Sequence, residues 1–306
     1  MYLFKYALLS VIILFSCTSA TAPDQNMPSR SLERSKEFDA YWYAGQAEIT
    51  TYDLEQVRYG ELRQGKSILV FVTEEMLLEK QVKKETSTTE ASVSVLKLNK
   101  IDRFTTGIYD YSMMLSTFTP VDQLTYPYVV KTAFSSQDWC GQSFMQINWK
   151  GAGYQTLLHS YFENEGDKSS RLPDVWVEDA LWTLARLDPR MLPQSDFEII
   201  PSSANLRMSH LPWIAMMAKG QLTLEMKASG DEQYIYEVCF EDGRELRIFL
   251  QTVFPYRIYG WEEKVKQGNE WLKSKAVMDV TTKSSYWREN SHAFDYKRKE
   301  LGLEKE

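Results

Sequence analysis

Apolar side chains take every second position in Gln221-Leu222-Thr223-Leu224-Glu225-Met226-Lys227. Successive side chains of a β-strand point to opposite faces of a sheet, so this alternation predicts a strand with one apolar face. A second apolar run covers residues 234–240 and is followed by Asp242-Gly243, a pair that is typical of a tight hairpin turn. The alternation resumes at Leu246, Ile248 and Leu250. Together the three segments predict an antiparallel meander.

Strand-like composition also extends over most of the chain that precedes this meander. Further segments rich in aromatic, β-branched or alternating apolar residues lie at 41–52, 67–73, 93–98, 109–118, 128–134, 144–149 and 154–162. Gly151 and Gly153 mark a turn between the last two segments. A sheet with so many strands usually curls or closes, because curling hides its edges. The sequence therefore predicts a mainly β fold, with a large antiparallel curved sheet or a barrel-like meander.

Helical periodicity is scarce in this sequence. The best candidate is an inserted helix at residues 175–187, where apolar residues recur at helical spacing. Asp174 is the expected N-cap of this helix, and Pro189 lies beyond its end. A short and highly charged C-terminal helix is predicted at residues 291–301.

The N-terminus has the three parts of a secretory signal. Lys5 precedes an apolar run at residues 7–15, and small residues follow it. The run is too short to span a bilayer, which takes about 20 apolar residues. Leu14-Phe15-Ser16-Cys17 is similar to a bacterial lipobox, in which the cysteine is lipidated and becomes the new N-terminus. An ordinary signal peptide, cut after Ala20 or Ala22, is the alternative.

Lipidation at Cys17 divides the chain into three expected parts. These are a signal peptide at residues 1–16, a lipidated flexible tether at 17–36, and a single β-rich domain at 37–306. Ser, Thr, Pro and charged residues dominate the tether, and such a composition cannot bury a core. Thr18, rather than an Asp, follows the cysteine. By resemblance to sorted lipoproteins, this predicts an anchor in the outer membrane and a domain that faces the periplasm.

Charge and motif content limit the expected partners. The 306 residues carry a formal net charge of −7, and an acidic chain is a poor candidate for binding nucleic acid. The three histidines stand far apart and match no zinc-site spacing, so neither a metal site nor a cofactor is predicted. The expected partners are the membrane, through the anchor at Cys17, and an amphiphile or another envelope protein.

Trp139-Cys140-Gly141-Gln142 is the most enzyme-like segment. A cysteine nucleophile needs a nearby base, and His159 or His210 could supply one in space. The alternative is a cysteine at a strand end before a glycine turn, because no protease signature surrounds it. We therefore assign no catalytic residue and keep Trp139, Cys140 and His159 as candidates for a functional pocket. Cys140 and Cys239 either form a disulfide or are two separate buried thiols.

Two groups of charged residues were weighed as further sites. Glu262 and Glu263 are adjacent in a predicted strand, so their side chains should lie on opposite faces and not share acid–base chemistry. Four basic residues could line an anion-binding cavity, and the alternative is that they are surface charges: Arg58, Lys80, Arg207 and Arg257.

Several motifs between Tyr41 and Glu263 resemble one family of uncharacterised bacterial envelope lipoproteins. They include Trp42-Tyr43-Ala44-Gly45, Val70-Phe71-Val72-Thr73-Glu74, Gln137-Asp138-Trp139-Cys140-Gly141 and Phe254-Pro255-Tyr256-Arg257-Ile258-Tyr259-Gly260-Trp261. Members are often labelled "septum formation inhibitor Maf". True Maf proteins are cytoplasmic nucleotide pyrophosphatases of α/β type with a Ser-x-Arg-Arg motif near the start. This chain starts with a signal-like segment and is β-rich, so the resemblance implies an envelope location and no known activity.

The leading functional hypothesis is an outer-membrane lipoprotein that is not an enzyme. Its concave sheet would hold an amphiphile or a partner protein, because concave apolar surfaces are where ligands usually bind. One alternative is an envelope hydrolase that uses Cys140 or a pair of carboxylates. A second alternative is a scaffold subunit of an envelope complex, which would expose a patch of Trp and Tyr side chains.

Overall fold

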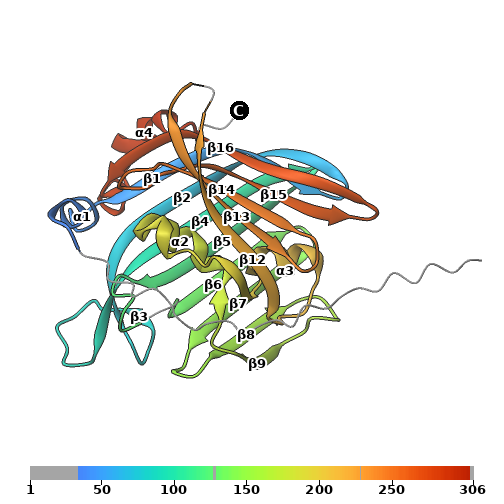
Figure 1. The fold of residues 1–306 in the computed structure, drawn as a ribbon, viewed down its shortest axis with the longest axis horizontal. Helices are drawn as coiled ribbons and strands as arrows, with labels where there is room; N and C mark the ends of the chain where they lie inside the picture. Colours follow the sequence, from blue (N-terminus) through green and yellow to red (C-terminus); the bar gives the residue numbers. More distant parts are fainter. Residues whose placement is uncertain (1–33, 127–128, 228, 304–306) are drawn as a thin grey trace, which may run out of the picture.

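The structure is a computed structural model that describes residues 34–126, 129–227 and 229–303 (Figure 1). The predicted signal peptide, the lipidation site Cys17 and all but the last residues of the tether lie outside the described residues.

One large curved sheet forms the body of the protein. Its strands run in the spatial order β10-β11-β12-β13-β14-β15-β16-β1-β2-β4-β5-β6-β7-β8-β9, and β3 pairs with β2 at the side. All pairs are antiparallel except β10 and β11. The strands are β1 (Ala47–Arg58), β2 (Glu61–Leu77), β3 (Val82–Lys83), β4 (Ser92–Thr106), β5 (Tyr109–Pro120), β6 (Lys131–Asp138), β7 (Gly141–Trp149), β8 (Tyr154–Ser160), β9 (Lys168–Leu172), β10 (Trp176–Val177), β11 (Ser195–Ile200), β12 (Met216–Met226), β13 (Glu232–Phe240), β14 (Glu245–Leu250), β15 (Ile258–Gln267) and β16 (Glu270–Ser284). The predicted mainly β fold with a barrel-like meander is confirmed.

The sheet curls but is not closed by hydrogen bonds between its edges. Its two edge strands are β9 and β10, which are consecutive in the chain and are joined by residues 173–175. This short connection keeps the two edges near each other, so the sheet wraps around an interior (Figure 1).

A helix occupies part of that interior. All seven residues of α2 (Leu181–Leu187) are buried, and α2 lies within the curve of the sheet (Figure 1). The other helices are α1 (Lys36–Trp42), α3 (Ser203–Ser209) and α4 (Tyr296–Glu300), and single turns of 3₁₀ helix are η1 (Glu178–Ala180), η2 (Pro189–Met191), η3 (Tyr286–Arg288) and η4 (His292–Phe294). The inserted helix and the short C-terminal helix are both present.

The strand predicted at residues 41–52 is wrong at its start. Residues 36–42 form α1, and the strand begins only at Ala47. The Ser35 side chain accepts a hydrogen bond from the Phe38 N–H at 3.0 Å, which caps the helix. Phe38 and Trp42 are buried four residues apart, on one helical face. This cap and the buried face outweigh the strand preference of the aromatic residues.

The helix predicted at residues 175–187 is wrong in its first half. Trp176 and Val177 form β10, which pairs in parallel with Ile199 and Ile200 of β11. The α-helix begins at Leu181 with Ala180 as its N-cap, so Asp174 does not cap it. Pairing with a strand that is distant in sequence therefore overrides the local helical spacing.

Candidate functional site

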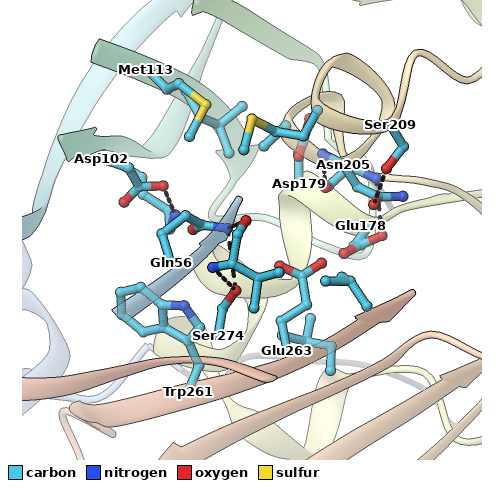
Figure 2. A pocket seen from close by; sticks show the side chains of 18 of the residues that line it. Gln56, Asp102, Met113, Glu178, Asp179, Asn205, Ser209, Trp261, Glu263 and Ser274 are labelled. Atoms are coloured by element: carbon cyan, nitrogen blue, oxygen red, sulfur yellow. Dashed lines mark hydrogen bonds and ion pairs between the residues drawn. The ribbon is translucent and has the colours of Figure 1, made fainter. Parts of the chain in front are cut away.

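The interior contains a cavity beside α2 (Figure 2). The volume open to the centre of a water-sized sphere is about 70 Å³. The walls come from β1, β4, β5, β6, β14, β15 and β16, and from η1, α2 and α3. They contain Gln56, Arg58, Lys100, Asp102, Met113, Leu115, Phe134, Glu178, Asp179, Trp182, Asn205, Met208, Leu246, Trp261, Glu263 and Ser274, among others.

Two carboxylates of this cavity share one guanidinium group. Arg244, which is buried in the turn before β14, donates from Nη1 to Glu178 Oε1 at 2.8 Å and to Glu263 Oε1 at 2.9 Å. Burial lowers the pKa of Arg244, but Glu178 and Glu263 raise it more, so it lies above its ordinary value. Burial also raises the pKa of Glu263, against the opposing effect of Arg244. One positive charge thus faces two carboxylates.

A third carboxylate lies next to this group. Asp179 is buried and accepts a hydrogen bond from the Ser203 hydroxyl at 2.7 Å. Burial raises the pKa of Asp179 to about 7, and the negative charge of Glu178 acts in the same direction. Near neutral pH, Asp179 therefore exchanges a proton within the cavity. Figure 2 shows Glu178 and Glu263 entering the cavity from η1 and β15.

Lys100 and two indole rings form another part of the wall. The Nζ of Lys100 pairs with Asp102, which also accepts a hydrogen bond from Ser67 Oγ at 2.5 Å. The same Nζ lies 5.1 Å from the ring centroid of Trp261 and 5.6 Å from that of Trp182. A cation over aromatic rings is stabilised by their negative faces.

Apolar side chains of β5, β6 and α3 form a further part of the wall, namely Met113, Leu115, Phe134 and Met208. Amide and hydroxyl groups line the cavity as well, among them Gln56, Asn205 and Ser274. The lining therefore combines charged, uncharged polar and apolar groups, which suits a ligand that has both a polar and an apolar part.

Arg58 lies at the wall of the cavity near the end of β1. Its Nη1 donates to the Met208 carbonyl oxygen at 2.7 Å and its Nη2 to the Tyr111 hydroxyl at 3.0 Å. Arg58 is buried, and within the described part of the chain no carboxylate lies within ion-pair distance of it. Its positive charge is held by hydroxyl and carbonyl oxygens and by the Tyr59 ring, whose centroid lies 4.2 Å from the guanidinium carbon.

The residues predicted for a functional pocket lie elsewhere. Trp139 and Cys140 are exposed in the turn between β6 and β7, and His159 lies on β8 with its side chain half exposed. His159 Nδ1 lies 3.2 Å from Asp167, while His210 pairs with Glu165. None of them lines the cavity. Both histidines are thus occupied by carboxylates and not by the thiol.

The cysteines differ from both alternatives considered for them. Cys140 and Cys239 are free thiols, so they do not form the disulfide, and both are exposed rather than buried. Burial and the nearby Glu237 and Glu245 raise the pKa of Cys239, which lowers its reactivity as a thiolate.

The four basic residues considered for an anion cavity do not gather in one place. Arg58 lines the interior cavity, whereas Lys80 pairs with Glu90 on the surface. Arg207 lies 3.4 Å from Asp138, and Arg257 lies 3.9 Å from Glu48.

Sequence reasoning missed most of this site. Glu262 and Glu263 do lie on opposite faces: Glu262 pairs with Lys273 outside, and Glu263 with Arg244 inside. The partner carboxylate of Glu263 is Glu178, which is distant in sequence. The adjacent acids Glu178-Asp179 before the apolar segment 180–185 are the signal available in the sequence, and they fall inside the helix predicted at residues 175–187.

Neither a metal site nor a spanning helix is found in the described ranges. Among residues 34–303 without the gaps at 127–128 and 228, no group of three or more His, Cys, Asp or Glu side chains could hold a metal ion. No helix in the same ranges is long and apolar enough to cross a membrane.

Comparison with known proteins assigns no family to this chain. No family model and no curated protein matches the sequence. One solved structure is similar, a crystal structure described as a β-barrel-like protein of the domain of unknown function DUF1849 from Brucella abortus. Its sequence identity is 10% and its TM-score is 0.43, and the alignment covers 78% of this chain and 98% of that one.

Proposed function

We propose that this protein is a lipoprotein of the bacterial outer membrane that faces the periplasm and binds a small amphiphile in its interior cavity. The observation that supports the binding role is a cavity lined by buried charged groups together with apolar side chains of β5, β6 and α3. The lipid-anchor part of the proposal rests on the lipobox-like segment that ends at Cys17. Fold-level likeness contributes nothing to the choice of ligand.

The cavity limits the size and the head group of the ligand. Only about 70 Å³ of the cavity is open to the centre of a water-sized sphere, so a long acyl chain does not fit. Glu178 and Glu263 share the guanidinium of Arg244, and Lys100 acts on Glu263 more weakly, so a proton or a positively charged head group placed between the two carboxylates would balance the local negative charge. A short amphiphile with an amine or another hydrogen-bond donor at its head fits both conditions.

Native mass spectrometry of the protein, expressed to the periplasm with Cys17 replaced by Ser, tests the binding role. We expect a reproducible added mass that matches an amphiphile. Glu263→Gln should reduce the occupancy, because it removes a charge from the cavity wall. Glu262→Gln is the matched control, since the neighbouring side chain lies on the outer face. A clean protein mass, or equal loss in both variants, would contradict the binding role.

Fractionation tests the anchor separately. Cys17→Ala should release the protein from the membrane fraction and abolish lipid labelling. A Cys17→Ala protein that is still lipid-labelled and sediments with the outer membrane would refute the anchor without bearing on the cavity.

A scaffold role is favoured by one separate observation. Aromatic side chains are exposed in connections at one end of the sheet: Tyr59 is 54% exposed after β1, Trp139 is 72% exposed after β6, and Tyr161 is 76% exposed after β8. These connections share an end because alternate connections of an antiparallel meander lie together. Site-specific crosslinking from position 139 to one reproducible envelope protein, together with an empty cavity, would favour the scaffold. A hydrolase that uses Cys140 has less support, because the histidines pair with carboxylates and not with the thiol. The form of that alternative that uses two carboxylates is supported by Glu178 and Glu263, which meet at Arg244 in the cavity.

A further inference from the structure

A row of polar side chains crosses four neighbouring strands on the outer face of the sheet. Lys131 of β6 pairs in register with Asn148 of β7, Asn148 with Gln155 of β8, and Gln155 with Arg171 of β9. The residues that alternate with this row are buried on the inner side, including Thr132, Ile147 and Thr156. Neighbouring strands are about 4.8 Å apart, so the row is about 14 Å long.

The row runs through a recess that we name the β6–β9 groove. It consists of two adjoining hollows that share Lys150 and Gln155. Its charged lining residues are Lys80, Lys131, Lys150 and Arg171, and the described lining residues include no Asp or Glu. The groove is therefore strongly positive in a chain whose formal net charge is −7.

Most of these cations lack an internal counter-ion. Lys80 pairs with Glu90 at 2.8 Å. Lys131 Nζ donates to the Gln81 carbonyl oxygen at 3.0 Å, and burial lowers the pKa of this lysine. Within the ranges that the structure describes, no carboxylate lies within 4.0 Å of the charged groups of Lys131, Lys150 or Arg171. An anionic ligand would supply the missing partner, and charge-assisted hydrogen bonds to it would be the stronger kind.

The side chains between the cations indicate the class of the ligand. Gln155 carries an exposed amide, which can both donate and accept hydrogen bonds and so suits a hydroxyl group. The amides of Gln146 and Asn148 also line the groove, but Gln146 donates to Asn148 Oδ1 and Asn148 Nδ2 donates to Gln81, so they shape the floor of the groove. Tyr154 is the only aromatic residue among the described lining residues, and it is buried, so the groove offers no platform for stacking nucleobases. A recess also fits a chain better than it fits the plane of a bilayer.

We propose that the β6–β9 groove binds an extended acidic polysaccharide across the strands. Lys131 and Arg171 would contact its acidic groups, and the exposed amide of Gln155 would contact a hydroxyl between them. This site is on the outside of the sheet and is independent of the interior cavity.

Calorimetric titration of the full chain carrying Cys17→Ser with a galacturonic acid hexamer tests this proposal. We expect binding that weakens as salt is added, since exposed charges are screened. Lys131→Ala/Arg171→Ala should weaken it by about tenfold or more, because two charge-assisted contacts are lost. Lys219→Ala/Lys266→Ala is the matched control; it removes two exposed lysines from β12 and β15 and should leave affinity unchanged.

Several results would overturn the proposal. These are no detectable binding of the hexamer, equal weakening in the control variant, or equal binding of a neutral maltohexaose. Binding to phosphatidylglycerol vesicles that depends on Lys131 and Arg171, without binding of the hexamer, would assign the groove to a membrane surface instead. Arg171→Ala alone guards against misfolding, because Arg171 is exposed on an edge strand. Its circular dichroism spectrum should match the parent while its affinity falls.

Discussion

Substitution of Glu48 by Gln should be among the most destabilising single changes in this protein. Glu48 of β1 and Arg186 of α2 are 0% and 1% exposed at their side chains. Arg186 Nη2 donates to Glu48 Oε2 at 2.8 Å, and Nη1 pairs with the other oxygen. Arg186 also donates from Nε to the Pro255 carbonyl oxygen at 3.0 Å. This bidentate pair joins the interior helix to the sheet.

The expected magnitude follows from the complete burial of the pair. Removing one partner leaves the other charge buried without compensation, which costs about 3–5 kcal/mol of unfolding free energy. A second cation, Arg257, lies 3.9 Å from Glu48 and would lose the same partner. Glu48→Gln/Arg186→Met removes both charges of the pair, so it should cost less than the sum of the single changes, with a coupling of about 2 kcal/mol or more.

Urea unfolding followed by circular dichroism measures these costs. Glu262→Gln is the control, because it breaks an ion pair with Lys273 of similar length, 2.8 Å, whose side chains are 24% and 51% exposed. This exposed pair should contribute less than about 1 kcal/mol. A Glu48→Gln cost as small as that of the control, or additive costs in the double variant, would refute the reasoning.

Three further predictions concern single sites. The pKa of Asp179 is about 7 in the folded protein and about 3.9 in the unfolded chain, so between these values only the folded state holds the proton, and the free energy of unfolding should fall by at most about 4 kcal/mol as pH rises through that window. Thermal melts at pH 5 and pH 8 should show this dependence flattened in Asp179→Asn, and an unchanged slope would count against it. In the native protein with Cys17 replaced, Cys140 and Cys239 should both react with a thiol reagent, and Cys140 should react faster because the pKa of Cys239 is raised. Protection of either thiol until denaturant is added would contradict the exposure of that thiol. Gly65→Ala should destabilise the protein by about 1–3 kcal/mol in urea unfolding, because a Cβ at this position of β2 would lie 2.2 Å from the Arg103 carbonyl oxygen of β4. A neutral effect would show that the two strands can move apart to admit the methyl group.

Much of the strand content could be predicted from local pattern. The alternation at residues 221–227 falls on the second half of β12, which ends at Met226, and the predicted turn at Asp242-Gly243 joins β13 to β14 with Gly243 at a φ of 87°. A turn of this kind favours glycine, because a positive φ strains other residues. The last residues of the inserted helix were also predicted, since Pro189 lies just beyond α2.

The candidate site could not be predicted in the same way. Glu178, Arg244 and Glu263 lie far apart in the chain and meet only because the sheet curls around η1. The raised pKa of Asp179 depends on burial, which no local pattern reveals. Cys140, by contrast, had an enzyme-like setting in sequence but lies in an exposed turn.

The sequence by itself determined the alternation of faces, the hairpin turns and the surplus of acidic residues, because these properties depend on neighbours along the chain. Tertiary structure decided that residues 36–42 form a helix, that Trp176 and Val177 form a strand, and that Glu48 meets Arg186. The physical reason is that burial and pairing between distant segments add energies larger than local propensity. They also decide which charges lose their contact with water, and so which carboxylates and cations need a partner.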